Sequence, residues 1–237
     1  MSPAPRVVRR VVAGAGQPAV VLEAGMNCGA EAWERVIPLL APRVRVAAYD
    51  RAGLGGSEPA PDLADIDRQV DDLASVITGL AAGPCVLAGH SWGGLLVQLL
   101  AFRRPDLAAG LVLVDPGHEE MESHLPLPLR WGWRVKRAVF GDELHDDAPA
   151  TVAAMRELRA AARPFPDVPV IVLSAARGLP RRFRAHWTSL QAGLAATAPQ
   201  GRHVVVDGTG HNIPIDRPDV VAGTILAVAA QARASGT

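Results

Sequence analysis

The sequence predicts an α/β fold with a mainly parallel central sheet flanked by helices, for three reasons. Short apolar runs alternate with helical patterns along most of the 237 residues, which is the arrangement that βαβ units produce. An apolar strand pattern, a glycine-flanked serine and an apolar helix pattern follow one another over residues 84–101. Hydrophobic residues make up 49% of the chain, which is enough for one substantial core. We therefore expect a single domain spanning residues 1–237.

Each element is predicted by a pattern of its own. Apolar runs bounded by turn residues indicate strands, and they lie at residues 7–12, 19–22, 44–49, 85–88, 111–114, 168–173 and 203–206. Apolar positions at helical spacing indicate helices, and they lie at residues 33–40, 66–80, 95–103, 183–195 and 220–234. Residues 117–167 interrupt the alternation with prolines, tryptophans and a helical stretch, so we expect a small helical cap inserted there.

Composition and charge bear on the partners and the location of the protein. The 24 Lys and Arg residues balance the 24 Asp and Glu residues, so no overall field attracts nucleic acid or an anionic membrane. The sequence shows no signal peptide and no apolar run of membrane-spanning length. Cys28 and Cys85 do not resemble a disulfide framework. We expect a cytoplasmic monomer or homodimer whose partner is a small-molecule substrate, with no nucleic acid or membrane partner.

The most informative motif places a serine between a strand and a helix. It reads Gly89-His90-Ser91-Trp92-Gly93, with apolar residues 85–88 before it and residues 95–100 after it. Gly-x-Ser-x-Gly alone is a weak signal in a glycine-rich chain. Strand, sharp turn and helix together form the nucleophile elbow that exposes a serine hydroxyl. Side chains at positions 89 and 93 would crowd the turn and the helix that folds back over the sheet.

Ser91 needs a base that takes its hydroxyl proton and a third group that orients the base. In this architecture the acid follows the serine along the chain, and the histidine comes last. His211 is the last suitable histidine, and it lies in a glycine-containing loop directly after the apolar run 203–206. Such a loop can place the imidazole over the edge of the sheet, so we expect His211 to be the base.

In combination, these motifs make the chain similar to the α/β-hydrolase-fold family. The matching segments cover most of its length and lie at residues 23–26, 49–57, 89–93, 112–115, 168–172 and 210–211. The resemblance implies the α/β-hydrolase fold, with a nucleophile on the elbow and an oxyanion hole beside it. It does not identify a substrate, because this fold serves many chemistries.

The triad acid departs from the pattern of many relatives. They carry it after the strand that follows the cap, where residues 173–178 of this chain contain no carboxylate. Asp115 ends the strand after the elbow helix, where some family members carry the acid and where sites of open α/β sheets gather. We expect Asp115 to be the acid, with Asp207 and Glu119 as alternatives. A turn role for Asp115 is the competing interpretation.

The resemblance also implies two backbone donors for an oxyanion. One is the N–H of Trp92, directly after the serine, and the other is the N–H of Met26, in the loop after strand 19–22. Relatives often have His-Gly before this second donor, whereas this chain has Ala24 and Gly25. We expect four side chains to line the substrate pocket: Asn27, Trp131, Trp133 and Trp187.

Two further groups of residues are not expected to take part in catalysis or in metal binding. Asp50 and Arg51 resemble a recurring pair of the family, and we expect them to organise the loop below the site. His118 and His124 lack the His-Glu-x-x-His spacing that presents two imidazoles on one helical face. We therefore expect no metal site and no cofactor.

The sequence thus predicts a serine hydrolase that cleaves a carboxylic ester, lactone or thioester through an acyl-enzyme on Ser91. An acyltransferase or cyclase that excludes water, or a hydrolase of carbon–carbon bonds, is the alternative among enzymes. A non-catalytic small-molecule receptor is the alternative outside enzymes, although the presence of both Ser91 and His211 argues against it. The serine also argues against dehalogenase and epoxide hydrolase chemistry, since those relatives use a carboxylate nucleophile.

Overall fold

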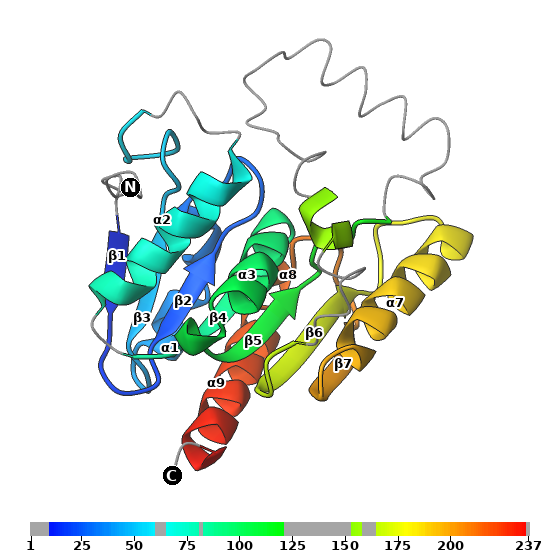
Figure 1. The fold of residues 1–237 in the computed structure, drawn as a ribbon. Helices are drawn as coiled ribbons and strands as arrows, with labels where there is room; N and C mark the ends of the chain where they lie inside the picture. Colours follow the sequence, from blue (N-terminus) through cyan, green and yellow to red (C-terminus); the bar gives the residue numbers. More distant parts are fainter. Residues whose placement is uncertain (1–9, 60–64, 81–82, 121–152, 158–164, 236–237) are drawn as a thin grey trace.

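The structure is a computed structural model that describes residues 10–59, 65–80, 83–120, 153–157 and 165–235 (Figure 1). Within these ranges, seven strands form one sheet in the order β1-β3-β2-β4-β5-β6-β7, and only the pairing of β1 with β3 is antiparallel. The strands are β1 (Arg10–Ala13), β2 (Val20–Glu23), β3 (Val46–Tyr49), β4 (Cys85–His90), β5 (Ala108–Val114), β6 (Pro169–Ala175) and β7 (Gln200–Val206). The predicted α/β class with a mainly parallel sheet is confirmed.

Helices cover both faces of this sheet (Figure 1). One face carries α2 (Ile66–Gly79), α3 (Trp92–Arg103) and α7 (Arg181–Ala196). The other face carries α1 (Ile37–Leu40), α8 (Ile213–Asp216) and α9 (Pro218–Ser235). Two 3-10 helices, η1 (Ala30–Trp33) and η2 (Pro105–Leu107), complete the described elements.

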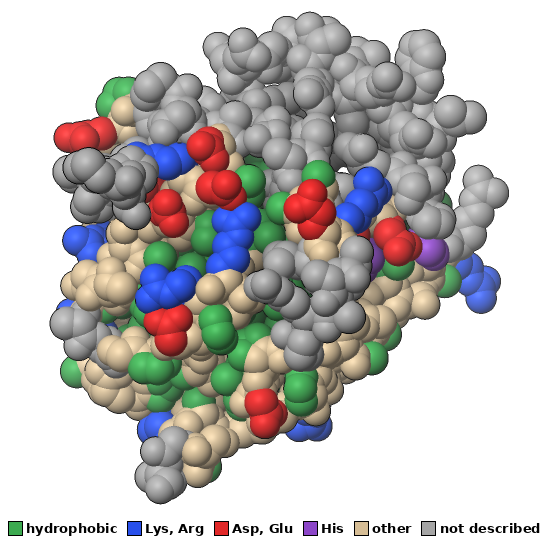
Figure 2. All heavy atoms as spheres, in the orientation of Figure 1, with side chains coloured by type: hydrophobic (Ala, Val, Ile, Leu, Met, Phe, Trp, Pro, Cys, Tyr) green, Lys and Arg blue, Asp and Glu red, His purple; other side chains and the backbone are tan. Residues whose placement is uncertain are grey.

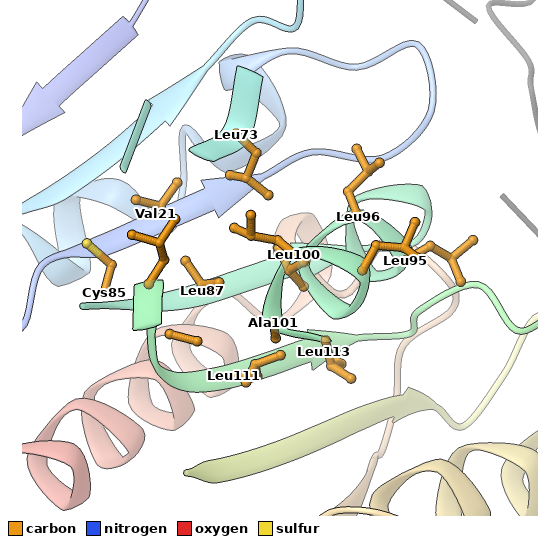
Figure 3. Packing of buried hydrophobic residues seen from close by; sticks show 14 of the residues in the cluster. Val21, Leu73, Cys85, Leu87, Leu95, Leu96, Leu100, Ala101, Leu111 and Leu113 are labelled. Atoms are coloured by element: carbon orange, nitrogen blue, oxygen red, sulfur yellow. The ribbon is translucent and has the colours of Figure 1, made fainter. Parts of the chain in front are cut away.

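Strand residues alternate between the two hydrophobic cores under these helices. Figure 3 shows the first core, in which Leu87 and Leu111 of the sheet lie with Leu73 of α2 and Leu100 of α3. The neighbouring strand residue Val86 belongs to the second core, beneath α9. All six residues of β4 are buried, as a central parallel strand requires. Burial on both faces fixes β4 and α3, and with them the turn that carries the serine.

The register of the central strands aligns their carboxyl-terminal residues along one edge of the sheet. His90 pairs with Val114, and Val114 pairs with Leu173. One residue further along, the Ser91 N–H donates to the Val114 carbonyl at 3.0 Å, and the Asp115 N–H donates to the Leu173 carbonyl at 2.7 Å. Ser91 and Asp115 therefore lie on neighbouring strand ends, at the edge where open α/β sheets build their sites.

Two helices differ from the sequence expectation. The single helix expected over residues 33–40 is instead η1 followed by the separate, short α1. Pro38 lies in the first turn of α1 and has no N–H to continue a preceding helix, so the helix starts again beside it. The short helix α8 was not expected, and it too has a proline in its first turn.

The expected cap lies largely outside the described residues. Of residues 117–167, the structure describes residues 117–120, 153–157 and 165–167, and residues 153–157 are helical. Met155 is fully buried, and the Phe165 ring lies 4.7 Å from that of Phe102 on α3. Trp131 and Trp133, the expected pocket residues, lie outside the described ranges, as does most of the expected cap.

Acidic and basic side chains are interspersed on the face of the molecule drawn in Figure 2. This distribution accords with the balanced charge of the sequence. Among the helices that the structure describes, none combines the length and the apolar character needed to cross a membrane.

Candidate active site

Ser91 occupies the sharp turn between β4 and α3. Its φ of 53° and ψ of −114° lie outside the regions that L-residues favour, and strain of this kind often accompanies functional turns. A Cβ atom on Gly89 would collide with the Gly93 carbonyl oxygen, and one on Gly93 would collide with the Glu23 carbonyl oxygen. The crowding predicted at both glycines is therefore confirmed.

Two hydrogen bonds join Ser91, His211 and Asp115 in series. His211 Nε2 lies 2.9 Å from Ser91 Oγ, and His211 Nδ1 lies 2.6 Å from Asp115 Oδ2. Because a carboxylate only accepts hydrogen bonds, Nδ1 carries the imidazole proton and Nε2 is left to accept the serine hydroxyl. This arrangement is the one that lets a histidine remove a proton from a serine.

Asp115 is supported as a carboxylate by donors on both of its oxygens. Oδ1 accepts the Ala175 backbone N–H at 3.2 Å and the Trp187 indole N–H at 3.0 Å, while Oδ2 faces His211. Burial alone would raise the pKa of Asp115. The hydrogen bond and charge of His211, together with the bonds from Trp187 and Ala175, instead hold this pKa below its ordinary value. Asp115 therefore remains charged and orients the imidazole.

The described pocket candidates are Trp187 and Asn27. Trp187 is 6% exposed and donates its indole N–H to Asp115, and its place on the pocket wall stays a prediction. This hydrogen bond has a physical reason, because a buried indole N–H needs an acceptor and the carboxylate provides it. Asn27 is exposed in the loop after β2, with a φ of 55°.

The loop that carries His211 is fixed before and after the histidine. The Arg177 N–H donates to the Thr209 carbonyl at 3.0 Å, and the Thr209 hydroxyl donates to Asp216 Oδ2 at 2.7 Å. The His211 side chain itself is 53% exposed. The imidazole is thus held in place while it remains accessible to water.

The loop after β2 passes directly against the elbow. A Cβ atom on Gly25 would lie 3.5 Å from the Ser91 Cβ. Among the described residues, neither the Met26 nor the Trp92 amide donates a hydrogen bond. The Trp92 indole N–H donates to Gln69 Oε1 at 3.0 Å, which anchors the start of α3. The role of these two amides as oxyanion donors stays a prediction.

Comparison with known proteins identifies the family. The sequence model of the alpha/beta hydrolase family matches residues 12–224. The chain belongs to this family. It is 25% identical to the protein YqjL of Bacillus subtilis (strain 168) over 205 residues, which are 85% of this chain and 79% of YqjL. It is 42% identical to the lipase LipV of Mycobacterium tuberculosis (strain H37Rv) over 84 residues, which are 35% of this chain and 31% of LipV.

A solved structure shows the same α/β hydrolase fold. The malate-bound thermophilic esterase from Thermogutta terrifontis superimposes with a TM-score of 0.64 at 24% identity, over 93% of this chain and 92% of the esterase. The predicted α/β-hydrolase fold is therefore confirmed.

His90 is a residue of this α/β hydrolase site that the sequence reasoning missed. Its ring centroid lies 4.8 Å from that of His211, and its Nε2–H donates to the His211 backbone carbonyl at 2.9 Å. Burial first, and the neighbouring His211 second, lower the pKa of His90 to about 4. His90 is thus a neutral neighbour of the base at pH 7. His90 is the first x of the Gly-x-Ser-x-Gly pattern, where any residue is allowed. The motif therefore did not indicate that this side chain contacts His211.

Replacing His90 by glutamine is expected to make folding less sensitive to acid. Because the pKa falls from 6.5 to about 4 in the folded hydrolase, the neutral ring stabilises the fold above pH 6.5. That contribution is lost as the pH falls toward 4, and it amounts to about 3 kcal/mol. Urea denaturation at pH 7 and at pH 4 measures the effect. Between these two pH values, the free energy of unfolding should fall further in the wild type than in His90→Gln. The facing groups, His211 and Asp115, are present in both proteins, so equal falls would show the prediction to be wrong.

The structure also describes the other two carboxylate candidates. Asp207 is exposed after β7, and Glu119 is buried with Oε2 3.6 Å from His118 Nδ1. Of the three candidate acids, Asp115 is the one that contacts the histidine. In the described ranges, no group of three or more His, Cys, Asp or Glu side chains is arranged to hold a metal ion. His124 lies outside those ranges.

Asp50 organises the loop after β3. Its Oδ1 accepts the Ala30 N–H at 2.8 Å, and its Oδ2 accepts the Gly56 N–H at 2.9 Å. The Ser57 hydroxyl donates to the Asp50 carbonyl at 2.6 Å. These bonds are those of a residue that shapes the loops around the site.

Proposed function

We propose that this α/β hydrolase is a serine hydrolase that cleaves a carboxylic ester, lactone or thioester through an acyl-enzyme on Ser91. The observation that carries the proposal is the hydrogen-bonded series from Ser91 Oγ through both nitrogens of His211 to Asp115. A hydroxyl in contact with an imidazole that a buried carboxylate orients is prepared to attack a carbonyl. The partial similarity to a lipase is in keeping with ester chemistry.

In the first half of the reaction, Ser91 Oγ attacks the carbonyl carbon while His211 Nε2 takes the hydroxyl proton. The carbonyl oxygen becomes an oxyanion, and the amides of Met26 and Trp92 donate hydrogen bonds to it. His211 then gives its proton to the leaving alcohol or thiol as the bond to the acyl carbon breaks. Throughout, the Asp115 carboxylate stabilises the imidazolium.

In the second half, water takes the place of the leaving group. His211 removes a proton from the water, and the water oxygen attacks the acyl carbon. The bond to Ser91 Oγ breaks, Oγ regains a proton from His211, and the carboxylic acid leaves. The exposed edge of the His211 ring, with 53% of the side chain accessible, supports the approach of that water.

Product partitioning tests the acyl-enzyme. Two butyrate esters with different leaving groups, p-nitrophenyl and phenyl, are hydrolysed in the presence of methanol, and butyric acid and methyl butyrate are quantified. A shared acyl-enzyme gives the same ratio of the two products from both esters. Different ratios would contradict a common intermediate on Ser91.

The product ratio, together with a wider panel of substrates, separates the rival functions. Formation of methyl butyrate with almost no butyric acid favours an acyltransferase over a hydrolase. Absence of turnover with a panel of esters, lactones and thioesters, in a folded protein that binds such compounds, favours a receptor.

A further inference from the structure

Arg51 lies just after β3 and is buried against the end of β2, with 6% of its surface exposed. Its guanidinium meets an oxygen on each of three consecutive residues. Nη1 donates to Glu23 Oε1 at 2.6 Å and to the Ala24 carbonyl at 2.7 Å, and Nη2 donates to the Gly25 carbonyl at 2.6 Å. The loop that contains the Met26 amide is therefore fastened to this one side chain immediately before that amide.

The Gly25 carbonyl sets the direction of the Met26 N–H. These two groups belong to one peptide unit, and in a planar trans peptide the C=O and the N–H point in opposite directions. The carbonyl is held from one side by Arg51 Nη2 and also accepts the Cys28 N–H at 3.2 Å. With the oxygen fixed in this way, the Met26 N–H is turned away from Arg51.

The same loop passes against the elbow. A Cβ atom on Gly25 would lie 3.2 Å from His90 Nδ1 and 3.5 Å from Ser91 Cβ, so the loop and the serine turn are in direct contact. A small rotation of the Gly25–Met26 peptide would therefore change what the amide presents to the site.

We propose that Arg51 is a positioning residue for the oxyanion loop, which it acts on by holding the Ala24 and Gly25 carbonyls so that the Met26 N–H faces the oxyanion. This inference rests on the proposed function and extends it to a residue outside the reacting atoms. Glu23 and Tyr49 hold Arg51 in turn. The Glu23 carboxylate forms an ion pair with the guanidinium and accepts a hydrogen bond from the Tyr49 hydroxyl. The loop of this chain has Ala24 where relatives often have histidine, and the Arg51 guanidinium holds it through the backbone carbonyls of Ala24 and Gly25.

The geometry explains why an arginine is needed. A guanidinium presents several N–H donors in a fixed plane and can satisfy a carboxylate and two carbonyls together. A lysine ammonium keeps the positive charge for Glu23 but has fewer donors and no fixed fork. Arg51→Lys therefore preserves the ion pair while it loosens the two carbonyls.

The test compares Arg51→Lys with Arg45→Lys. Arg45 also uses a guanidinium nitrogen to hold a backbone carbonyl, that of Leu80 at 3.0 Å, but at the end of α2. With p-nitrophenyl butyrate, kcat of Arg51→Lys should fall about 10- to 100-fold, approaching the loss of one oxyanion donor. KM and the pH dependence of kcat should stay unchanged, because Ser91, His211 and Asp115 are intact. Arg45→Lys should keep kcat within about two-fold of the wild type.

Each outcome decides the inference. Wild-type turnover with an unchanged kcat in Arg51→Lys, or an equal fall in both variants, would overturn it while leaving the proposed function standing. No turnover by the wild type would remove both. If Arg51→Lys does not fold, Glu23→Gln replaces it, since the amide keeps the shape but weakens the anchor of the guanidinium. A lower kcat at constant KM in that variant supports the inference, and an unchanged kcat refutes it.

Discussion

Replacing Ser91 by alanine is expected to lower kcat for ester hydrolysis by about 10⁴-fold or more. The substitution removes the hydroxyl that lies 2.9 Å from His211 Nε2, so no acyl-enzyme can form. It leaves the β4 and α3 packing untouched, and it leaves both proposed oxyanion amides in place. Turnover of p-nitrophenyl butyrate by the purified variant measures the loss, with circular dichroism and thermal unfolding to verify the fold.

Ser75→Ala is the matched control for this substitution. The Ser75 hydroxyl lies on α2, where it donates to the Asp71 carbonyl at 2.9 Å, away from the candidate site. Its kcat should equal that of the wild type within about two-fold, as for most surface substitutions. Undiminished activity in Ser91→Ala would end the account of a serine nucleophile.

Replacing Asp115 by asparagine is expected to lower kcat by about 10³- to 10⁴-fold. The Asp115 Oδ1 position receives two donors, from Ala175 and Trp187, so an asparagine keeps its oxygen there and turns its NH₂ toward His211. That NH₂ donates to Nδ1 and moves the imidazole proton to Nε2, which can then no longer accept the serine hydroxyl. Steady-state kinetics with p-nitrophenyl butyrate measures kcat, and KM should change little.

Asp207→Asn serves as the control for the acid. Asp207 is an exposed carboxylate close to His211 in sequence, and it was an alternative for the triad acid. Its substitution should leave kcat within about two-fold of the wild type. If Asp207→Asn loses activity while Asp115→Asn retains it, the assignment of the acid is wrong.

The residues that the structure brings together at Ser91 were largely predictable from the sequence. Ser91 was indicated by its place between an apolar run and an apolar helix, and His211 by its place after the last strand. Asp115 was indicated by the resemblance, because some family members carry the acid at the end of this strand and residues 173–178 contain no carboxylate. Strand ends that share one edge of a parallel sheet must lie together, so the local patterns, the order of the triad along the chain and the family resemblance together indicated these residues. The catalytic roles of these residues stay predictions.

The individual contacts of the supporting residues were not predictable, although Arg51 was expected to help organise the loop below the site. His90 and Arg51 act on backbone carbonyls, those of His211 and Gly25, and a carbonyl is present at every residue. The sequence around Trp187 shows an aromatic ring but not the acceptor of its indole N–H, which lies 72 residues away on Asp115. Such contacts depend on tertiary packing and produce no characteristic spacing of residues in the sequence.

The central claim, that Ser91 is an activated nucleophile, is tested most directly by intact-protein mass spectrometry after treatment with a fluorophosphonate. The wild type and Ser91→Ala are treated side by side at pH 7, and the folded state of each is verified. The account predicts one phosphonyl adduct on the wild type and none on the variant. An unmodified wild type, or an adduct of equal yield on both proteins, would contradict it.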